Sequence, residues 1–417
     1  MTALSIALGA AVRAANALGA LLNQSGLPLI SLEEGDVLAA ARRRTRLDDF
    51  GDEDFREPLR MVLRGLDDEA RLTLIGRIAA REDVVGLLAN RLRLQEDGKR
   101  HPEIRAEQVS QPLFIVGMPR TGSTLLHHLL AQDPASRVAQ AWEVIAPSPP
   151  PETATYATDP RIASAARKLG WFDTLAPEFK AIHPLGAQLA LECIAIMSPS
   201  FRTSRFHTSY RVPTYQNWLE GQDLGPAYGF HRRMLQQLQW RTPAGRWVLK
   251  APSHLFALDA LLGAYPDARI VQTHRDPLTV LGSVASLTAI LHGAFSRSID
   301  LAEIGREVSH RWTSGLERAM QFRQGGAVAA DRFVDVHYHD LIRDPLAVVR
   351  RIYAHFEIPL RDTAETRMRG FLEANPKDKH GSHRYTLDSF GLEPDVLIGR
   401  FKAYCEHFGV PRETPGP

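Results

Sequence analysis

The 417-residue chain has little cysteine and little net charge. It contains only Cys193 and Cys405, and its formal net charge is +2. Two cysteines are too few for a disulfide framework or a cysteine-ligated metal cluster, and they fit a reducing cytoplasm, where we expect the protein to work. A charge balance this close to neutral gives no reason to expect nucleic acid as a partner. Any strongly basic site must therefore be local.

The alanine-rich start of the chain lacks the marks of a targeting or membrane-spanning segment. Residues 3–22 are apolar, but no basic stretch precedes them, and Arg13 and Asn16 interrupt them. We therefore expect neither a signal peptide nor a membrane span. Leucine and alanine recur there at three- and four-residue spacing, which predicts an amphipathic helix. Packing within the protein, a homodimer contact and peripheral contact with a membrane surface are the alternatives for this helix.

The chain divides into two regions by its hydrophobic pattern. Residues 1–108 show helical periodicity, which predicts an all-α N-terminal region. From residue 109 to 417, short apolar runs alternate with helical segments, which is typical of an α/β fold with a parallel sheet flanked by helices. We expect its strands at 113–116, 247–250, 269–273 and 333–338. An excursion at about 142–245 is expected to cover the ligand crevice.

The stretch from Leu113 to Leu130 joins a predicted strand, a glycine-bearing loop and a predicted helix start. Gly117 and Gly122 have the Walker A spacing, but Ser123 stands where that motif has its lysine. The backbone N–H groups of such a loop and the positive end of the helix dipole form a cradle for a phosphate or sulfate. Alone, this spacing is a weak signal, because ordinary strand-helix turns also have it.

Three further stretches place basic or hydroxyl side chains where such a sheet binds anions. Lys250 ends a predicted strand and precedes His254, while Arg275 ends the next strand with Ser283 about two helical turns later. The late loop 377–385 is either a plain polar turn or a third part of the site. Its side chains that can be cationic or can donate to an anion include Lys379, His383, Arg384 and Tyr385.

In these motifs the chain resembles sulfotransferases that use 3′-phosphoadenosine 5′-phosphosulfate (PAPS), and most of all the bacterial branch that shares motifs with tyrosylprotein sulfotransferases. The family's 3′-phosphate motif, an arginine with a serine eight residues later, matches Arg275 and Ser283, and its lysine-proline element matches Lys250 and Pro252. The resemblance covers about residues 109–400 and implies a P-loop NTPase-like fold. The family's 5′-phosphosulfate loop matches Pro119, Arg120, Thr121, Gly122, Ser123, Thr124 and Leu125.

This resemblance implies an enzyme that moves a sulfuryl group from PAPS to a hydroxyl and releases 3′,5′-ADP. The acceptor is expected to be a small or lipophilic alcohol or phenol. Ser123 and Thr124 would bond the 5′-phosphate, and Arg120 and Lys250 would balance the charge on the bridging oxygen, by the logic of phosphoryl transfer. The scheme requires no metal.

Two residues are candidates for the base that takes the proton of the acceptor. In the tyrosylprotein branch a glutamate after the first helix has this role, and Glu143 in Ala141-Trp142-Glu143 occupies the matching place. The cytosolic branch uses a histidine from a different segment, for which His183, His207 and His254 are open. His254 is the second candidate after Glu143, because its motif lies beside the cradle.

Two rival functions are a P-loop kinase and a non-catalytic nucleotide-binding scaffold. A kinase would transfer phosphate from ATP with Mg²⁺, but the Walker lysine is missing, and the pair Arg275 and Ser283 fits a 3′-phosphate instead. Against a decayed scaffold stands the presence of Arg120, Lys250 and Glu143 together.

Overall fold

A computed structural model describes residues 16, 30–175, 185–242, 245–376 and 386–413. Most of the predicted amphipathic helix at 3–22 and the whole late loop 377–385 lie outside the described residues. Within the described part, five parallel strands form one sheet in the order β2-β3-β1-β4-β5. The strands are β1 Leu113–Gly117, β2 Ser136–Arg137, β3 Arg246–Lys250, β4 Arg269–His274 and β5 Phe333–His337.

The four predicted strands are therefore confirmed to within a residue or two, and the short edge strand β2 was not predicted. In the centre of the sheet, Ile115 of β1 stands opposite Lys250 of β3 and Val271 of β4. Parallel strands in this register bring their carboxyl ends to one edge, where α/β sheets bind ligands. The loop after β1, the end of β3 and the end of β4 thus meet at that edge.

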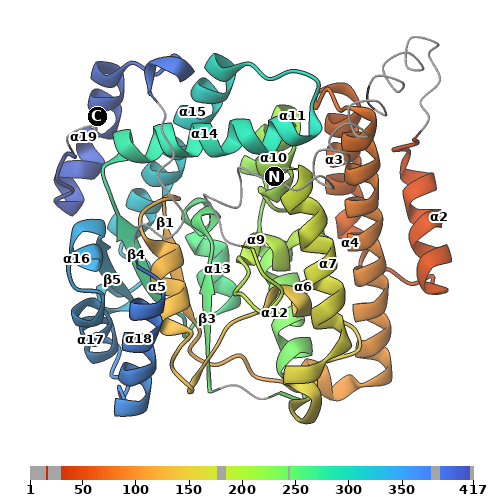
Figure 1. Cartoon of the computed structure of the whole chain (residues 1–417), viewed down its shortest axis with the longest axis horizontal. Helices are drawn as coiled ribbons and strands as arrows, with labels where there is room; N and C mark the ends of the chain where they lie inside the picture. The colour runs from red at the N-terminus through yellow and green to blue at the C-terminus, as the bar shows by residue number, and fades with distance from the viewer. Residues whose placement is uncertain (1–15, 17–29, 176–184, 243–244, 377–385, 414–417) are drawn as a thin grey trace.

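Alternate residues of the strands build two separate cores, since successive side chains of a strand point to opposite faces. Leu113 and Ile115 belong to one buried cluster, and Phe114 and Val116 belong to another. Helices cover both faces, which explains why all five residues of β1 are buried (Figure 1). The helices of the first cluster are α5 Ser123–Leu130, α16 Tyr338–Arg343, α17 Pro345–His355 and α18 Asp362–Ala374. Those of the second include α12 Gly225–Gln239, α13 Leu258–Ala264, α14 Pro277–Phe295, α15 Leu301–Gln324 and α19 Pro394–Phe408.

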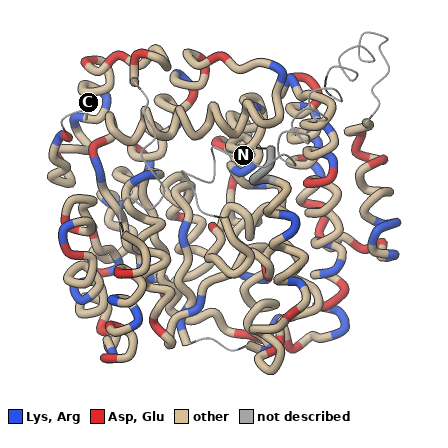
Figure 2. The backbone as a smooth tube through the Cα atoms, viewed as in Figure 1, with Lys and Arg blue, Asp and Glu red and all other residues tan. Residues whose placement is uncertain are grey.

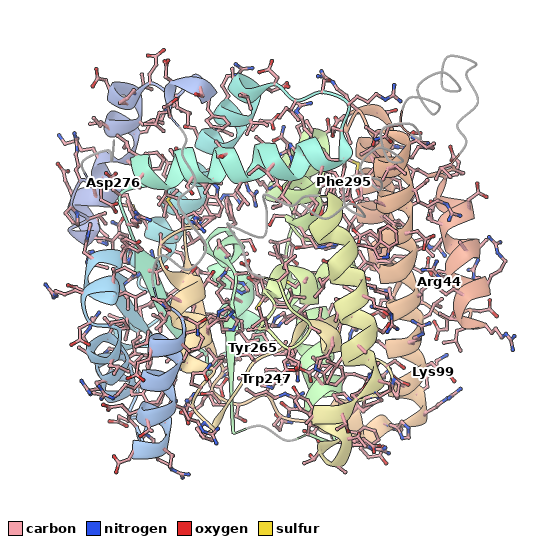
Figure 3. All side chains as sticks on the ribbon, viewed as in Figure 1. Arg44, Lys99, Trp247, Tyr265, Asp276 and Phe295 are labelled. Carbon is pink, nitrogen blue, oxygen red and sulfur yellow. The ribbon has the colours of Figure 1, made fainter. Side chains whose placement is uncertain are left out.

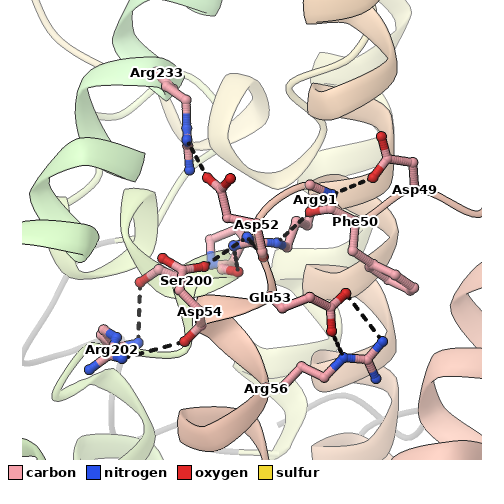
Figure 4. Close-up of polar contacts among 12 residues, drawn as sticks. Asp49, Phe50, Asp52, Glu53, Asp54, Arg56, Arg91, Ser200, Arg202 and Arg233 are labelled. Carbon is pink, nitrogen blue, oxygen red and sulfur yellow. Dashed lines mark hydrogen bonds and ion pairs between the residues drawn. The ribbon is translucent and has the colours of Figure 1, made fainter.

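The described N-terminal region is helical, as predicted, with α2 Glu34–Thr45, α3 Arg56–Asp68 and α4 Leu74–Arg100. These helices share a third apolar cluster with the excursion, to which Phe55, Phe206 and Tyr215 contribute. A buried arginine of α4, Arg91, ties the two parts together (Figure 4). Its guanidinium donates to the carbonyl oxygen of Phe50 at 2.8 Å and pairs with the Asp54 carboxylate at 3.1 Å, both in the N-terminal region. It also donates to the carbonyl oxygen of Pro199 in the excursion at 3.4 Å.

The excursion between β2 and β3 is mostly helical. Its elements are α6 Ala141–Ile145, η3 Thr153–Thr158, α7 Pro160–Leu175, α9 Cys193–Ile196, η4 Ser198–Ser200, α10 Arg205–Ser209, α11 Pro213–Glu220 and α12. The remaining short helices are η1 Glu53–Phe55, η2 Pro102–Ala106, η5 Pro252–Phe256, η6 Ala330–Arg332 and η7 Asp388–Phe390. Lys, Arg, Asp and Glu residues are interspersed over these elements, as expected from the small net charge (Figure 2).

Helix α14 carries the most apolar long segment of the described chain. It runs between Asp276 and Phe295 (Figure 3), and it is the one described helix that is long and apolar enough to cross a membrane. Slightly more than half of that segment, 56%, is buried inside the protein. Because it packs against α15 and contributes to the second core, its apolar character is explained by the fold.

Candidate active site

The loop between β1 and α5 adopts a conformation that requires its two glycines. Gly117 has φ +135°, and a Cβ there would lie 2.4 Å from Oγ1 and 2.5 Å from the carbonyl oxygen of Thr273. Gly122 has φ +84°, and a Cβ there would lie 2.7 Å from a methyl carbon of Leu341. Both positions therefore combine a left-handed backbone with a close neighbour. The glycine spacing of the sequence reflects these two constraints.

Helix α5 begins directly at the end of this loop. Its N-cap residue is Gly122, so no side chain caps the first N–H groups of the helix. Inside the loop, the hydroxyl of Thr121 donates to the carbonyl oxygen of Met118 at 2.7 Å and lies 2.6 Å from the hydroxyl of Thr273. These bonds hold the loop against β4. The loop and the N-terminus of α5 thus have the geometry that the sequence predicts for an anion cradle, and anion binding there stays a prediction.

A cavity of about 550 Å³ opens beside this cradle at the carboxyl edge of the sheet. Its polar lining includes Arg120, Ser123, Thr124, His128, Glu192, Lys250 and Arg275. Its apolar lining includes Leu125, Leu189, Leu287, Ile342, Phe371 and Leu372. The space can therefore accept a molecule with an anionic group and an apolar one.

The structure places Lys250 against the loop. Its side chain is buried, with the residue 3% exposed, and Nζ donates to the hydroxyl of Thr124 at 3.1 Å. Nζ also forms an ion pair with the carboxylate of Glu192. The ammonium of Lys250 therefore lies beside the loop, which contains no lysine of its own.

Arg275 and Ser283 lie next to the same loop. Arg275 follows β4 and donates from Nη1 to the carbonyl oxygen of Arg120 at 3.0 Å. Its guanidinium also lies 3.8 Å from the ring centroid of Tyr338. Ser283, on α14, accepts a hydrogen bond from Nε of Arg120 at 3.2 Å. The arginine and serine of the predicted 3′-phosphate motif are thus brought together around the cradle.

Glu143, the first candidate for the base, is held elsewhere. It is fully buried in α6, where one carboxylate oxygen pairs with Arg137 and the other accepts from the backbone N–H of Gln140 at 2.9 Å. The side chain of Gln140 completes a capping box with the backbone of Glu143. Glu143 does not contribute to the lining of the cavity beside the cradle. Its partners are Arg137 and the backbone at the start of α6, and its role as the base stays a prediction.

His254, the second candidate, is also enclosed in the core. Its Nδ1 lies 2.6 Å from the hydroxyl of Tyr228, and its ring meets that of Phe114 edge-on at 5.2 Å between centroids. Burial holds the pKa of His254 well below its usual range, with the charge of nearby His231 as a second cause. The structure therefore does not bring the imidazole to the cavity.

The polar residues of the lining that the sequence reasoning missed include Glu192 and His128. Glu192 precedes α9, and it is the single charged residue in the apolar run from Leu185 to Met197. A charged residue within an apolar run is rarely buried without a partner, so its position in the sequence indicates a polar site nearby. The other is His128 on α5, whose pKa is lowered to about 4 by burial and by the charge of Lys250. Its imidazole is therefore neutral at neutral pH.

The late loop cannot be placed against the site, since 377–385 lies outside the described residues. Asn375 and Pro376, which lead into it, line the cavity. The predicted contributions of Lys379, His383, Arg384 and Tyr385 therefore stay predictions. In the described parts of the chain, no group of three or more His, Cys, Asp or Glu side chains gathers as metal ligands would.

Comparison with known proteins gives a consistent result. The model of a sulfotransferase family matches residues 112–362. The crystal structure of sulfotransferase STF1 from Mycobacterium tuberculosis H37Rv is 35% identical with a TM-score of 0.80, covering 89% of this chain and 98% of that one. The structure of sulfotransferase STF9 from Mycobacterium avium is 31% identical with a TM-score of 0.82, covering 92% and 98%. The omega-hydroxy-beta-dihydromenaquinone-9 sulfotransferase Stf3 of Mycobacterium tuberculosis is 26% identical over 314 residues, which span 73% of this chain and 77% of that protein.

Proposed function

Because this chain belongs to the sulfotransferase family, we propose that it transfers the sulfuryl group of PAPS to the hydroxyl of a lipophilic alcohol and releases 3′,5′-ADP. The observation that carries the proposal is the meeting of the glycine loop, Lys250 and Arg275 around one cavity. A bisphosphorylated nucleotide needs two anion sites. The cradle supplies one, and Arg275 with Ser283 supplies the other.

The donor would lie with its 5′-phosphosulfate on the loop. Backbone N–H groups at the start of α5 and the hydroxyls of Ser123 and Thr124 are available there as donors. Arg275 would bind the 3′-phosphate, because a guanidinium presents paired N–H groups that match two phosphate oxygens. This arrangement explains why the loop works with serine in place of the Walker lysine.

In the transfer step, the acceptor oxygen forms a bond to sulfur as the bond from sulfur to the bridging oxygen breaks. The electron pair of the broken bond goes to the 5′-phosphate of 3′,5′-ADP, where negative charge grows. Lys250 and Arg120 balance that charge from fixed positions, which is how electrostatic preorganisation lowers a barrier. Their positive charge is already in place before the step, through the contacts of Lys250 with Thr124 and of Arg120 with Ser283.

The proton of the acceptor hydroxyl goes to Glu192 in this scheme, and not to Glu143. Glu192 lines the cavity and pairs with Lys250, whereas Glu143 is bound by Arg137 and a backbone N–H group away from the lining. The pairing also couples the two halves of the reaction. As negative charge grows on the leaving oxygen, that oxygen shares the positive charge of Lys250, so Glu192 loses part of its counter-charge and becomes a stronger base.

The apolar part of the lining supports a lipophilic acceptor. Leu125, Leu189 and Phe371 stand in the same cavity as Glu192 and Lys250, so an apolar chain bound there would present its hydroxyl near the charged pair. The name of the relative Stf3 describes sulfation of an omega-hydroxylated dihydromenaquinone, which is an alcohol of this kind.

Calorimetry with 3′,5′-ADP and ATP, followed by a PAPS conversion assay, tests the proposal. The protein should bind 3′,5′-ADP and not ATP, and it should convert PAPS in the presence of farnesol or an omega-hydroxylated isoprenoid quinol. Binding of ATP with Mg²⁺ in place of 3′,5′-ADP would favour the kinase alternative. Binding of 3′,5′-ADP with no conversion of PAPS by any acceptor of this class would favour the scaffold alternative.

A further inference from the structure

The segment after α19 brings a carboxylate back to the edge of the active site. Glu413 meets Arg275 in a two-point contact, with Nε donating to Oε1 and Nη2 donating to Oε2, each at 2.8 Å. The backbone N–H of Glu413 donates to Oδ2 of Asp276 at 2.8 Å. His339 lies on the same carboxylate, with its Nε2 3.6 Å from Oε1. Two residues in succession after β4 therefore hold Glu413.

This contact uses the part of Arg275 that a phosphate would need. Nη1 is directed to the carbonyl oxygen of Arg120, and the edge formed by Nε and Nη2 is taken by Glu413. A guanidinium edge binds one pair of anionic oxygens at a time. Both side chains are largely enclosed, with Arg275 18% and Glu413 13% exposed, so the pair is not a loose surface contact.

We propose that Glu413 is a built-in competitor for the 3′-phosphate of the donor. The inference rests on the proposed function, since it takes Arg275 as the ligand of that phosphate. A carboxylate cannot stay beside a bound phosphate without strong repulsion, so binding of the nucleotide displaces Glu413 from Arg275. The return of Glu413 favours release of 3′,5′-ADP after the transfer.

The fold provides a fixed anchor for this exchange. Asp276 is 2% exposed, and its second oxygen, Oδ1, caps α14 by accepting from the N–H of Leu278 at 3.1 Å. The Asp276 carboxylate therefore holds one end of α14 and the backbone of Glu413 together. The side-chain contacts of Glu413 with Arg275 and His339 break when the nucleotide enters, while its backbone stays on Asp276.

The test measures the affinity of the full-length protein for 3′,5′-ADP and for 5′-AMP, which lacks the 3′-phosphate. Glu413→Gln and Glu413→Ala should each bind 3′,5′-ADP about tenfold more tightly than the wild type. In these variants the 3′-phosphate no longer has to displace a carboxylate from Arg275. Their affinity for 5′-AMP should stay unchanged. Glu406→Gln is the matched control, since Glu406 is an exposed glutamate of α19 whose partner is Lys402. It removes the same charge and should change neither affinity.

Unchanged 3′,5′-ADP affinity in both Glu413 variants would overturn the inference, as would an equal gain for 5′-AMP. An equal gain in Glu406→Gln would also overturn it, because the effect would then be one of net charge. Arg275→Ala separates this failure from a failure of the proposed function. If Arg275→Ala leaves the preference for 3′,5′-ADP over 5′-AMP intact, Arg275 is not the 3′-phosphate ligand. Both the proposed donor site and the competitor role of Glu413 are then wrong.

Discussion

Replacement of Lys250 by methionine is the perturbation that isolates the proposed chemistry. Methionine keeps most of the buried aliphatic chain and removes only the ammonium that contacts Thr124 and Glu192. Loss of one preorganised donor of this kind costs about 10²–10³ in kcat, or roughly 3–4 kcal/mol of barrier. The affinity for 3′,5′-ADP should change by less than about tenfold, because backbone N–H groups of the loop bind the phosphate of the ground state.

The assay needs three measurements on each variant, which are kcat for PAPS conversion, the Kd of 3′,5′-ADP and the free energy of unfolding. Lys250→Met removes the ammonium that pairs with the Glu192 carboxylate, so we expect a stability loss of about 1–3 kcal/mol. The double variant with Glu192→Gln should recover this stability and keep the low kcat. A kcat within threefold of the wild type, or a loss of kcat that merely follows the loss of nucleotide affinity, would refute the role given to Lys250.

Three further predictions concern Gly117 of the loop, Glu143 and the imidazole of His128. Gly117→Ala should cost about 3 kcal/mol or more of stability, since strain and overpacking add, whereas Gly86→Ala in open space on α4 should cost nothing measurable by urea unfolding. Glu143→Gln should lower the free energy of unfolding by roughly 3–5 kcal/mol, because Arg137 keeps a buried charge, while kcat of the folded enzyme stays unchanged. Full stability with kcat lost would restore the base role of Glu143. The free energy of unfolding should fall as pH drops from about 6.5 toward 4, because the unfolded state protonates His128 near its ordinary pKa and the folded state only near about 4. The change in the free energy of unfolding with pH, measured by urea unfolding between pH 7.5 and 5, should become smaller in His128→Asn. An unchanged pH dependence would contradict the lowered pKa of His128 as its cause.

The strands, the loop and the edge of the sheet could be predicted because their signals are local. A buried apolar run followed by GxxxxG and a helix start is a short-range pattern, and the ends of parallel strands meet by topology alone. Lys250 and Arg275 follow from that rule, although they are far from the loop in sequence. These placements needed no knowledge of side-chain packing.

The base candidate could not be predicted in the same way. The position of Glu143, three residues after Gln140, also fits a capping box, and the sequence does not distinguish a capping glutamate from a catalytic one. Glu192 reaches the cavity only through the path of the excursion, which no local pattern specifies. The contact of Glu413 with Arg275 spans 138 residues and depends on how the chain returns after α19.

A crystal structure with bound 3′,5′-ADP tests the central claim most directly. The account predicts the 5′-phosphate on the loop before α5 and the 3′-phosphate within hydrogen-bond reach of Arg275 and Ser283, with the Glu413 carboxylate moved off Arg275. A nucleotide bound away from the loop, or a 3′-phosphate that contacts neither Arg275 nor Ser283, would contradict it.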